Sequence, residues 1–140
     1  MEKINLNSTK LGDLRFSVNE INSPQVAMIT NARIVAKRNN SGEVIDGTIA
    51  KLSLSGVDIK LYQLMHQQGL DVSGVIPITI EVVGDESYLK QINVEDIVGK
   101  IIDLRSAYVG LKWVARGNSG NWGGLKLILE EVKFVQPKSR

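Results

Sequence analysis

The sequence predicts a mainly β protein, a small five-stranded barrel with Greek-key connections, and three observations lead to this fold class. Two long runs of strand-forming residues, 100–116 and 122–136, are joined by a Gly/Asn/Ser cluster that is typical of a hairpin turn. A second pair of such runs flanks residues 39–42. Only residues 56–69 show a clear helical period.

The chain of 140 residues is long enough for one domain with its own hydrophobic core. We divide it into an N-terminal arm with a short strand (residues 1–24), a barrel domain (25–136) and a short basic tail (137–140). The chain contains no cysteine, which excludes disulfides and thiolate metal sites. It shows no signal-peptide pattern and no apolar run of about 18 residues, so we expect a soluble, cytoplasmic protein.

The N-terminal arm is polar, with isolated apolar residues. Alternation over residues 14–18 predicts a short strand, whereas residues 1–10 have no sustained period and are expected to be flexible. Ile4 and Leu6 lie in that flexible segment, and we expect them to pack on a neighbouring subunit as self-association residues. The alternative is an ordinary frayed terminus.

The first two barrel strands are predicted over residues 25–38 and 44–54, with a turn at 39–42. Apolar residues occur on both faces of the first strand, as expected for a strand that curls through a barrel wall. The turn brings Lys37 and Arg38 together at its base.

Residues 56–69 are predicted to form an amphipathic helix, because apolar residues recur at i, i+4, i+7 and i+8 from Val57. Ser55 is the expected N-cap, and Gly69 is the expected stop after the last turn. His66, the only histidine of the chain, lies on this helix. Without a second histidine or a carboxylate cluster nearby, we interpret it as a surface or packing residue.

Residues 75–83 alternate most regularly, with isoleucine and valine on one parity. Pro77 cannot donate a backbone hydrogen bond, which places this strand at an edge or places the proline at a strand end. The acidic segment 85–98 is predicted to be a short helical connection, and Gly99 closes it before the last hairpin.

The net charge of +2 conceals an uneven distribution. Residues 1–70 carry eight Lys/Arg and six Asp/Glu (+2), residues 71–97 carry one and six (−5), and residues 98–140 carry eight and three (+5). This asymmetry predicts one surface that faces anions and another surface opposite to it. The alternative is a mixed solvated surface.

The last hairpin carries cations interleaved with aromatic residues, a pattern typical of proteins that hold a phosphate backbone and stack unpaired bases. By parity, Tyr108 shares a face with Lys112 and Arg116, whereas Trp113 shares the other face with Val109 and is expected in the core. Trp122 is expected at the hairpin tip. The candidate nucleic-acid-binding residues are Lys37, Arg38, Arg105, Tyr108, Lys112, Arg116, Trp122 and Lys126.

Residue patterns that indicate enzymes do not occur in the sequence. A catalytic triad would have to use His66, and no nucleophile elbow accompanies it. The Gly-rich segment 117–124 lacks the Lys-Ser/Thr ending of a phosphate-binding loop and precedes a strand. The acids of residues 85–96 fit no calcium loop. We therefore expect a protein that is not an enzyme and has no cofactor and no metal.

The sequence segments 93–100 and 124–129 resemble those of OB-fold single-stranded-DNA-binding proteins. The order of the predicted strands and the residue pattern over 26–135 are also similar to that family. Specifically, the chain resembles the small single-stranded-DNA-binding proteins that are encoded on conjugative plasmids and mobile elements of Gram-positive bacteria. This resemblance implies an OB-fold-like barrel whose loops, here 38–43 and 117–123, form the rims of the binding cleft. It also implies largely sequence-independent binding of single-stranded DNA in plasmid conjugation or replication.

A different function class is the alternative: a β-barrel assembly or adaptor module of a virion or secretion machine. Such a module would bind protein partners through the N-terminal arm and the strand that contains Pro77. On the leading interpretation the partners are single-stranded nucleic acid, with DNA favoured over RNA, and further copies of the chain bound through the arm. No membrane partner is expected.

Overall fold

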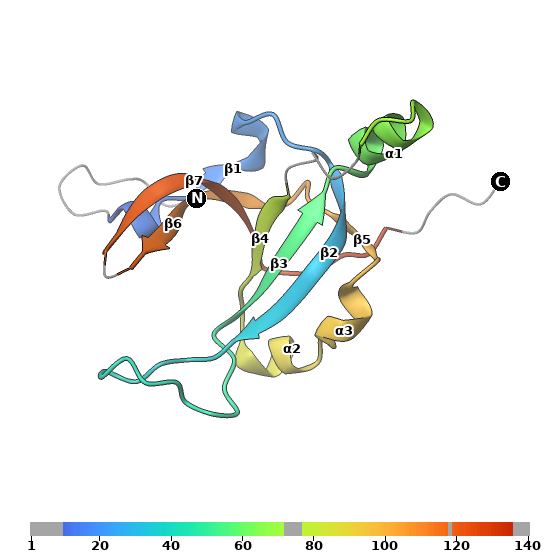
Figure 1. Cartoon of the computed structure of the whole chain (residues 1–140). Helices are drawn as coiled ribbons and strands as arrows, with labels where there is room; N and C mark the ends of the chain where they lie inside the picture. The colour runs from blue at the N-terminus through green and yellow to red at the C-terminus, as the bar shows by residue number, and fades with distance from the viewer. Residues whose placement is uncertain (1–9, 72–76, 118, 136–140) are drawn as a thin grey trace.

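The structure, a computed structural model, describes residues 10–71, 77–117 and 119–135 (Figure 1). Strands dominate these ranges, which confirms the prediction of a mainly β protein. In chain order the elements are η1 (Leu11–Asp13), β1 (Phe16–Ser17), η2 (Val18–Glu20), β2 (Val26–Val35), β3 (Lys51–Val57), α1 (Ile59–Gln67), β4 (Ile78–Val82), α2 (Glu86–Lys90), α3 (Val94–Ile97), β5 (Ile101–Asp103), β6 (Tyr108–Arg116) and β7 (Ser119–Leu129).

The described strands form one seven-stranded mixed sheet in the order β1-β6-β7-β4-β3-β2-β5. All neighbours are antiparallel except β4 and β7, which run parallel with Ile80 opposite Leu127. The sheet has seven strands where the sequence predicted five, and its ladder does not close into a barrel. β5 and β6, on opposite sides of the sheet order, are joined directly by residues 104–107.

The predicted long strand over 100–116 is divided by a bend at residues 104–107. The backbone N–H of Arg105 donates to the Asp103 carboxylate at 2.9 Å, and the N–H of Ala107 donates to the carbonyl of Leu104 at 3.1 Å. Leu104 and Ala107 are buried in the core, which anchors the bend. One continuous run of strand-forming residues therefore pairs with β2 before the bend and with β7 after it.

The hydrophobic core lies on one face of the curved sheet, and Leu89 of α2 and Ile97 of α3 are also fully buried in it. In β3 and β4 every second residue enters this core. This confirms the alternation predicted for residues 75–83 over the strand 78–82; residues 75 and 76 lie outside the described residues. The buried strand residues include Leu52, Leu54, Ile80, Val82, Val109, Leu127 and Leu129.

A β-bulge determines which residues of β2 reach the core. Ala27 and Ile29 are buried, but the register against β3 shifts just after Ile29. The extra residue reverses the alternation, so that beyond it Ala32 pairs with Leu54 on the core face and Arg33 faces outward. This explains why apolar residues occur on both parities of the sequence.

The second predicted strand starts later than expected, at Lys51 and not at Val44. Residues 36–50 form a long loop with its own hydrogen bonds, including an isolated bridge from Arg38 to Val44 and two backbone N–H groups that donate to the Asn39 side chain. Because these bonds satisfy the backbone locally, this part of the chain does not join the sheet.

Helix α1 lies within the predicted range 56–69, but Asp58 caps it. The side chain of Asp58 accepts two N–H groups of the first turn, whereas Ser55, the predicted cap, lies in β3. Gly69 ends the helix as predicted: it has φ 71° and donates its N–H to the carbonyl of His66 at 3.1 Å.

The apolar residues of α1 remain largely exposed. Leu61 and Leu64 are 44% and 51% exposed, and no residue of the helix is buried. Val57, from which the apolar period was counted, is the last residue of β3, so the helix begins after it. Within the helix, only Ile59, Tyr62 and Met65 are half-buried. None of the helices among the described residues is long and apolar enough to cross a membrane.

The remaining elements follow the sequence closely. β4 pairs with both β3 and β7, so it is not an edge strand; Pro77 lies just before it, as a strand end allows. The helical connection over 85–98 is confirmed as α2 and α3. The short strand predicted over 14–18 is β1, in which Phe16 pairs with Val109 of β6.

Candidate nucleic-acid interface

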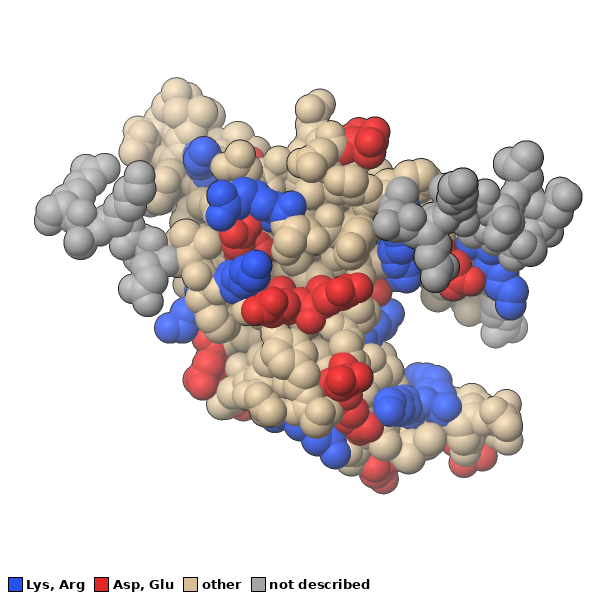
Figure 2. Space-filling view, turned by 180° about the vertical axis from the view of Figure 1, so that it is seen from behind, with Lys and Arg blue, Asp and Glu red and all other residues tan. Residues whose placement is uncertain are grey.

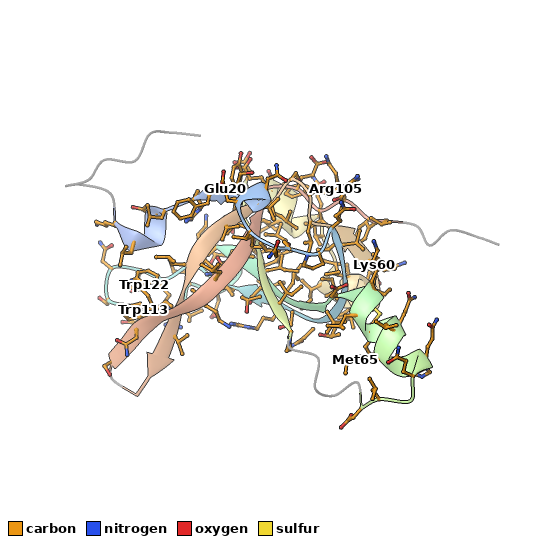
Figure 3. All side chains as sticks on the ribbon, turned by 90° about the horizontal axis from the view of Figure 1, so that it is seen from above. Glu20, Lys60, Met65, Arg105, Trp113 and Trp122 are labelled. Atoms are coloured by element: carbon orange, nitrogen blue, oxygen red, sulfur yellow. The ribbon has the colours of Figure 1, made fainter. Side chains whose placement is uncertain are left out.

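Two segments project from the same side of the molecule (Figure 1, Figure 3). We call residues 36–50 the loop arm and the outer part of the β6–β7 hairpin, residues 111–125, the hairpin arm. Among the described residues β7 pairs with β4 only from Leu127 to Leu129, so the hairpin arm is a two-stranded ribbon. The loops predicted as cleft rims, 38–43 and 117–123, lie on these two arms.

The hairpin ladder continues further than the Gly/Asn/Ser cluster suggested. Arg116 pairs with Ser119, which leaves two residues for the turn, where the sequence predicted a tip over residues 117–121. Gly117 supplies the positive φ of 61° that the turn requires. An irregularity next to Gly124, which has φ 95°, shifts the register of the outer ladder.

Trp113 and Trp122 face each other across the hairpin arm, with ring centroids 5.0 Å apart and an angle of 78° between the rings (Figure 3). They are 53% and 39% exposed. The prediction that Trp113 lies in the core is wrong: it shares the parity of the buried Val109, but the arm extends beyond the core. Its ring lies over Gly120, where an added Cβ would be 2.6 Å from the indole.

Over β3 and β4 the face of the sheet opposite the core is polar. The register places Arg33 of β2 opposite Ser53 of β3, and Ser53 opposite Glu81 of β4. Further along this face, the Nζ of Lys112 in β6 donates to the hydroxyl of Thr79 at 2.9 Å. We call this surface the polar sheet face; it consists of Arg33, Lys51, Ser53, Thr79, Glu81, Lys112 and Lys126.

Glu81 lies between two lysines of the polar sheet face. Its Oε2 is 2.8 Å from the Nζ of Lys51, and its Oε1 is 2.9 Å from the Nζ of Lys126. Burial raises the pKa of Glu81, but the hydrogen bonds and charges of the two lysines outweigh burial and hold this pKa below its usual value. Glu81 is therefore ionised at neutral pH, and the four cations of this face exceed its one acid.

The ion pairs of Glu81 are expected to make the stability of the fold depend on pH in the acid range. The folded-state pKa lies below the ordinary value of 4.5, so the contribution of Glu81 is complete above that value and is lost as pH falls through the folded pKa. Melting temperatures of the wild type and Glu81→Gln, measured from neutral pH downward, should therefore converge as the pH falls. A difference that stays constant with pH would contradict this assignment.

Among the predicted site residues, the structure brings Lys112 and Lys126 together on the polar sheet face. Lys126 is only 17% exposed because it is engaged with Glu81. Lys37 and Arg38 lie on the loop arm, where Lys37 pairs with Glu86 of α2 at 3.0 Å. The guanidinium of Arg38 donates to the carbonyl of Gly42 within the loop.

Other predicted residues lie apart from this face or are engaged locally. Arg105 lies away from the tryptophan pair (Figure 3) and forms an ion pair of 2.7 Å with Asp103. The hydrogen bond from Arg105 holds the pKa of Asp103 below its usual value. Tyr108 is half-buried and paired with Ser17 of β1. Arg116 is the last residue of β6, at the end of the hairpin arm.

Sequence reasoning missed Arg33, Lys51, Thr79 and Glu81. A signal for Lys51 was present, because polar Lys51, Ser53 and Ser55 alternate with buried leucines in β3. Such alternation predicts a polar outer face. The expected self-association residues, Ile4 and Leu6, lie outside the described residues.

The view from behind shows acidic side chains in a row across the middle of the molecule, with basic side chains around them (Figure 2). Among the described residues, no cluster of three or more histidines and acids has the arrangement of a metal site. Comparison with models of protein families, with curated proteins and with solved structures found no match to this chain.

Proposed function

We propose that this protein binds single-stranded nucleic acid, with DNA favoured over RNA, without enzymatic activity and largely without sequence preference. The observation that carries the proposal is the combination of an outward-facing cationic surface across neighbouring strands with an exposed tryptophan pair on an adjoining two-stranded arm. Arg33 and Lys112 supply charge for phosphates, and Lys51 supplies part of its charge because it is paired with Glu81. Trp113 and Trp122 supply apolar rings for unpaired bases, which stack without regard to sequence.

The strand order supports an OB-fold-like interpretation of the sheet. β2, β3 and β4 form a meander, β4 is parallel to β7, and β7 is antiparallel to β6. If β5 and β6 are treated as the two halves of one bent strand, the first half pairs with β2 and the second with β7. That is the connectivity of a five-stranded barrel with an open seam, a fold that commonly takes up oligonucleotides between its loops.

The cations and the tryptophans lie on opposite faces of the hairpin, because Lys112 and Trp113 are successive strand residues. The arm is only two strands wide, so a flexible single strand that passes over its edge contacts both faces. A duplex is too stiff to follow this path. This geometry favours single strands over duplex DNA.

Binding of protein partners is the second candidate function, and the exposed apolar side chains of α1 favour it. Leu61 and Leu64 lie on a helix without a buried residue. On this interpretation the protein is an assembly or adaptor module, and its association with a partner depends little on salt.

Titration of a labelled, unstructured oligonucleotide at several salt concentrations tests the proposal. If at least three phosphates are neutralised, log K should fall with log salt with a slope of about −2. An oligothymidylate and a duplex of equal length should differ, with the single strand bound more tightly. Binding that does not change with salt, or the absence of binding at low salt, would contradict the proposed function.

A further inference from the structure

We propose that Glu81 is an internal competitor for the phosphates of a bound strand, an inference that rests on the proposed function. Its carboxylate lies between the ammonium groups of Lys51 and Lys126, with one oxygen directed at each. A phosphate is bound in the same way, by two cations that converge on its anionic oxygens. The chain thus fills with its own side chain a position where a phosphate would bind.

The burial of these groups supports a strong internal contact. The side chains of Glu81, Lys126 and Lys51 are 13%, 17% and 34% exposed, so bulk water and salt screen their attraction less than at an open surface. Both contacts are charge-assisted hydrogen bonds, the stronger class in proteins. A phosphate therefore gains access to these lysines only after it displaces the carboxylate.

The ion pairs of Glu81 lower the affinity of the polar sheet face for a nucleic-acid strand. With Glu81 in place, an approaching strand finds Arg33 and Lys112 as cations that are not paired with an acid in the described structure; Lys112 contacts the neutral hydroxyl of Thr79. The two lysines bound to Glu81 contribute less than their charge suggests. Glu81 thus limits affinity.

The test compares the wild type with Glu81→Gln and Glu81→Thr, two variants that remove the charge. The second places a β-branched residue, which favours strands, in β4 and serves if the glutamine variant folds poorly. Binding of a labelled oligothymidylate is measured at about 0.05 M and about 0.2 M salt, with the fold checked by melting temperature. Glu95→Gln, in the exposed first turn of α3, removes the same charge outside the polar sheet face and is the control.

Freeing one or two lysines is expected to increase affinity about 5- to 25-fold near 0.1 M salt and to steepen the salt slope by about 0.7 to 1.4. Glu95→Gln should leave affinity nearly unchanged. Adding Lys51→Gln to the Glu81→Gln variant should cancel much of the gain. Because this double variant has the net charge of the wild type, it is the comparison with Glu95→Gln that separates release of the lysines from a general change in net charge.

The outcomes distinguish the two proposals. If the wild type binds and neither folded Glu81 variant binds more tightly, the inference is overturned while the proposed function stands. If the wild type binds weakly and the variants bind tightly, both are supported. If none of the proteins binds the oligonucleotide at low salt, both are overturned. An equal gain in Glu95→Gln would also overturn the inference, because it would show an effect of net charge alone.

Discussion

Replacing Trp113 by alanine is expected to weaken single-strand binding about 5- to 150-fold, because a stacked base contributes about 1–3 kcal/mol. Trp122→Ala should have an effect of the same kind, since the two rings support each other edge to face. Stacking is screened much less than phosphate pairing, so the loss should persist at high salt. The same titration as for the wild type measures it.

The fold should tolerate the Trp113 substitution, because the ring is 53% exposed and lies beyond the core. Phe134→Ala removes an aromatic side chain that is 54% exposed, outside the hairpin arm, and is the matched control. Equal affinities for the wild type, Trp113→Ala and Phe134→Ala would remove the tryptophan pair from the interface. A large drop in melting temperature in Trp113→Ala would show that the ring belongs to the core after all.

Reversing the charge of Arg33 and Lys112 together is the second change with a large expected effect. Loss of two phosphate contacts should weaken binding on the order of 20-fold near 0.1 M salt, and repulsion by the new carboxylates should add to this loss. Arg33 faces solvent, and the reversal at Lys112 removes a single hydrogen bond, to the Thr79 hydroxyl. The melting temperature should therefore change little. The salt slope of the variant should be shallower by about 1.4.

A double reversal at Lys60 and Lys100 makes the same change in net charge at exposed positions outside the polar sheet face. Lys60 lies on α1, away from the tryptophan pair (Figure 3). If this control loses as much affinity as the Arg33/Lys112 variant, net charge governs binding and no particular face does. If neither variant loses affinity, phosphates are not bound through these cations.

Local features of the fold were predictable because they depend on neighbours in sequence. The hairpin around Gly117 follows from residues that allow positive φ, and the end of α1 at Gly69 follows from the same property. The alternation in β4 likewise identified Ile80 and Val82 as core residues. Each of these features needs only a few consecutive residues.

The candidate site depended more on tertiary structure. The parity of β6 correctly placed Trp113 with Val109 on one face, but parity does not say where along a strand the core ends. Lys126 looked like a free phosphate contact because its partner Glu81 lies on a strand 45 residues earlier in the numbering. Ion pairs between distant segments have no signal in a single sequence.

The sequence by itself determined the mainly β class, the hairpins, the position of α1 and the cation-rich character of the last hairpin, because strand and turn preferences are local properties of the chain. Only the tertiary structure decided that one run of residues bends at Leu104 into β5 and β6, and that Trp113 is exposed. It also assembled the polar sheet face from Arg33, Lys51, Glu81 and the other residues of five strands. The physical reason is that sheet pairing joins segments far apart in sequence, and pairing sets which side chains meet and which remain in solvent.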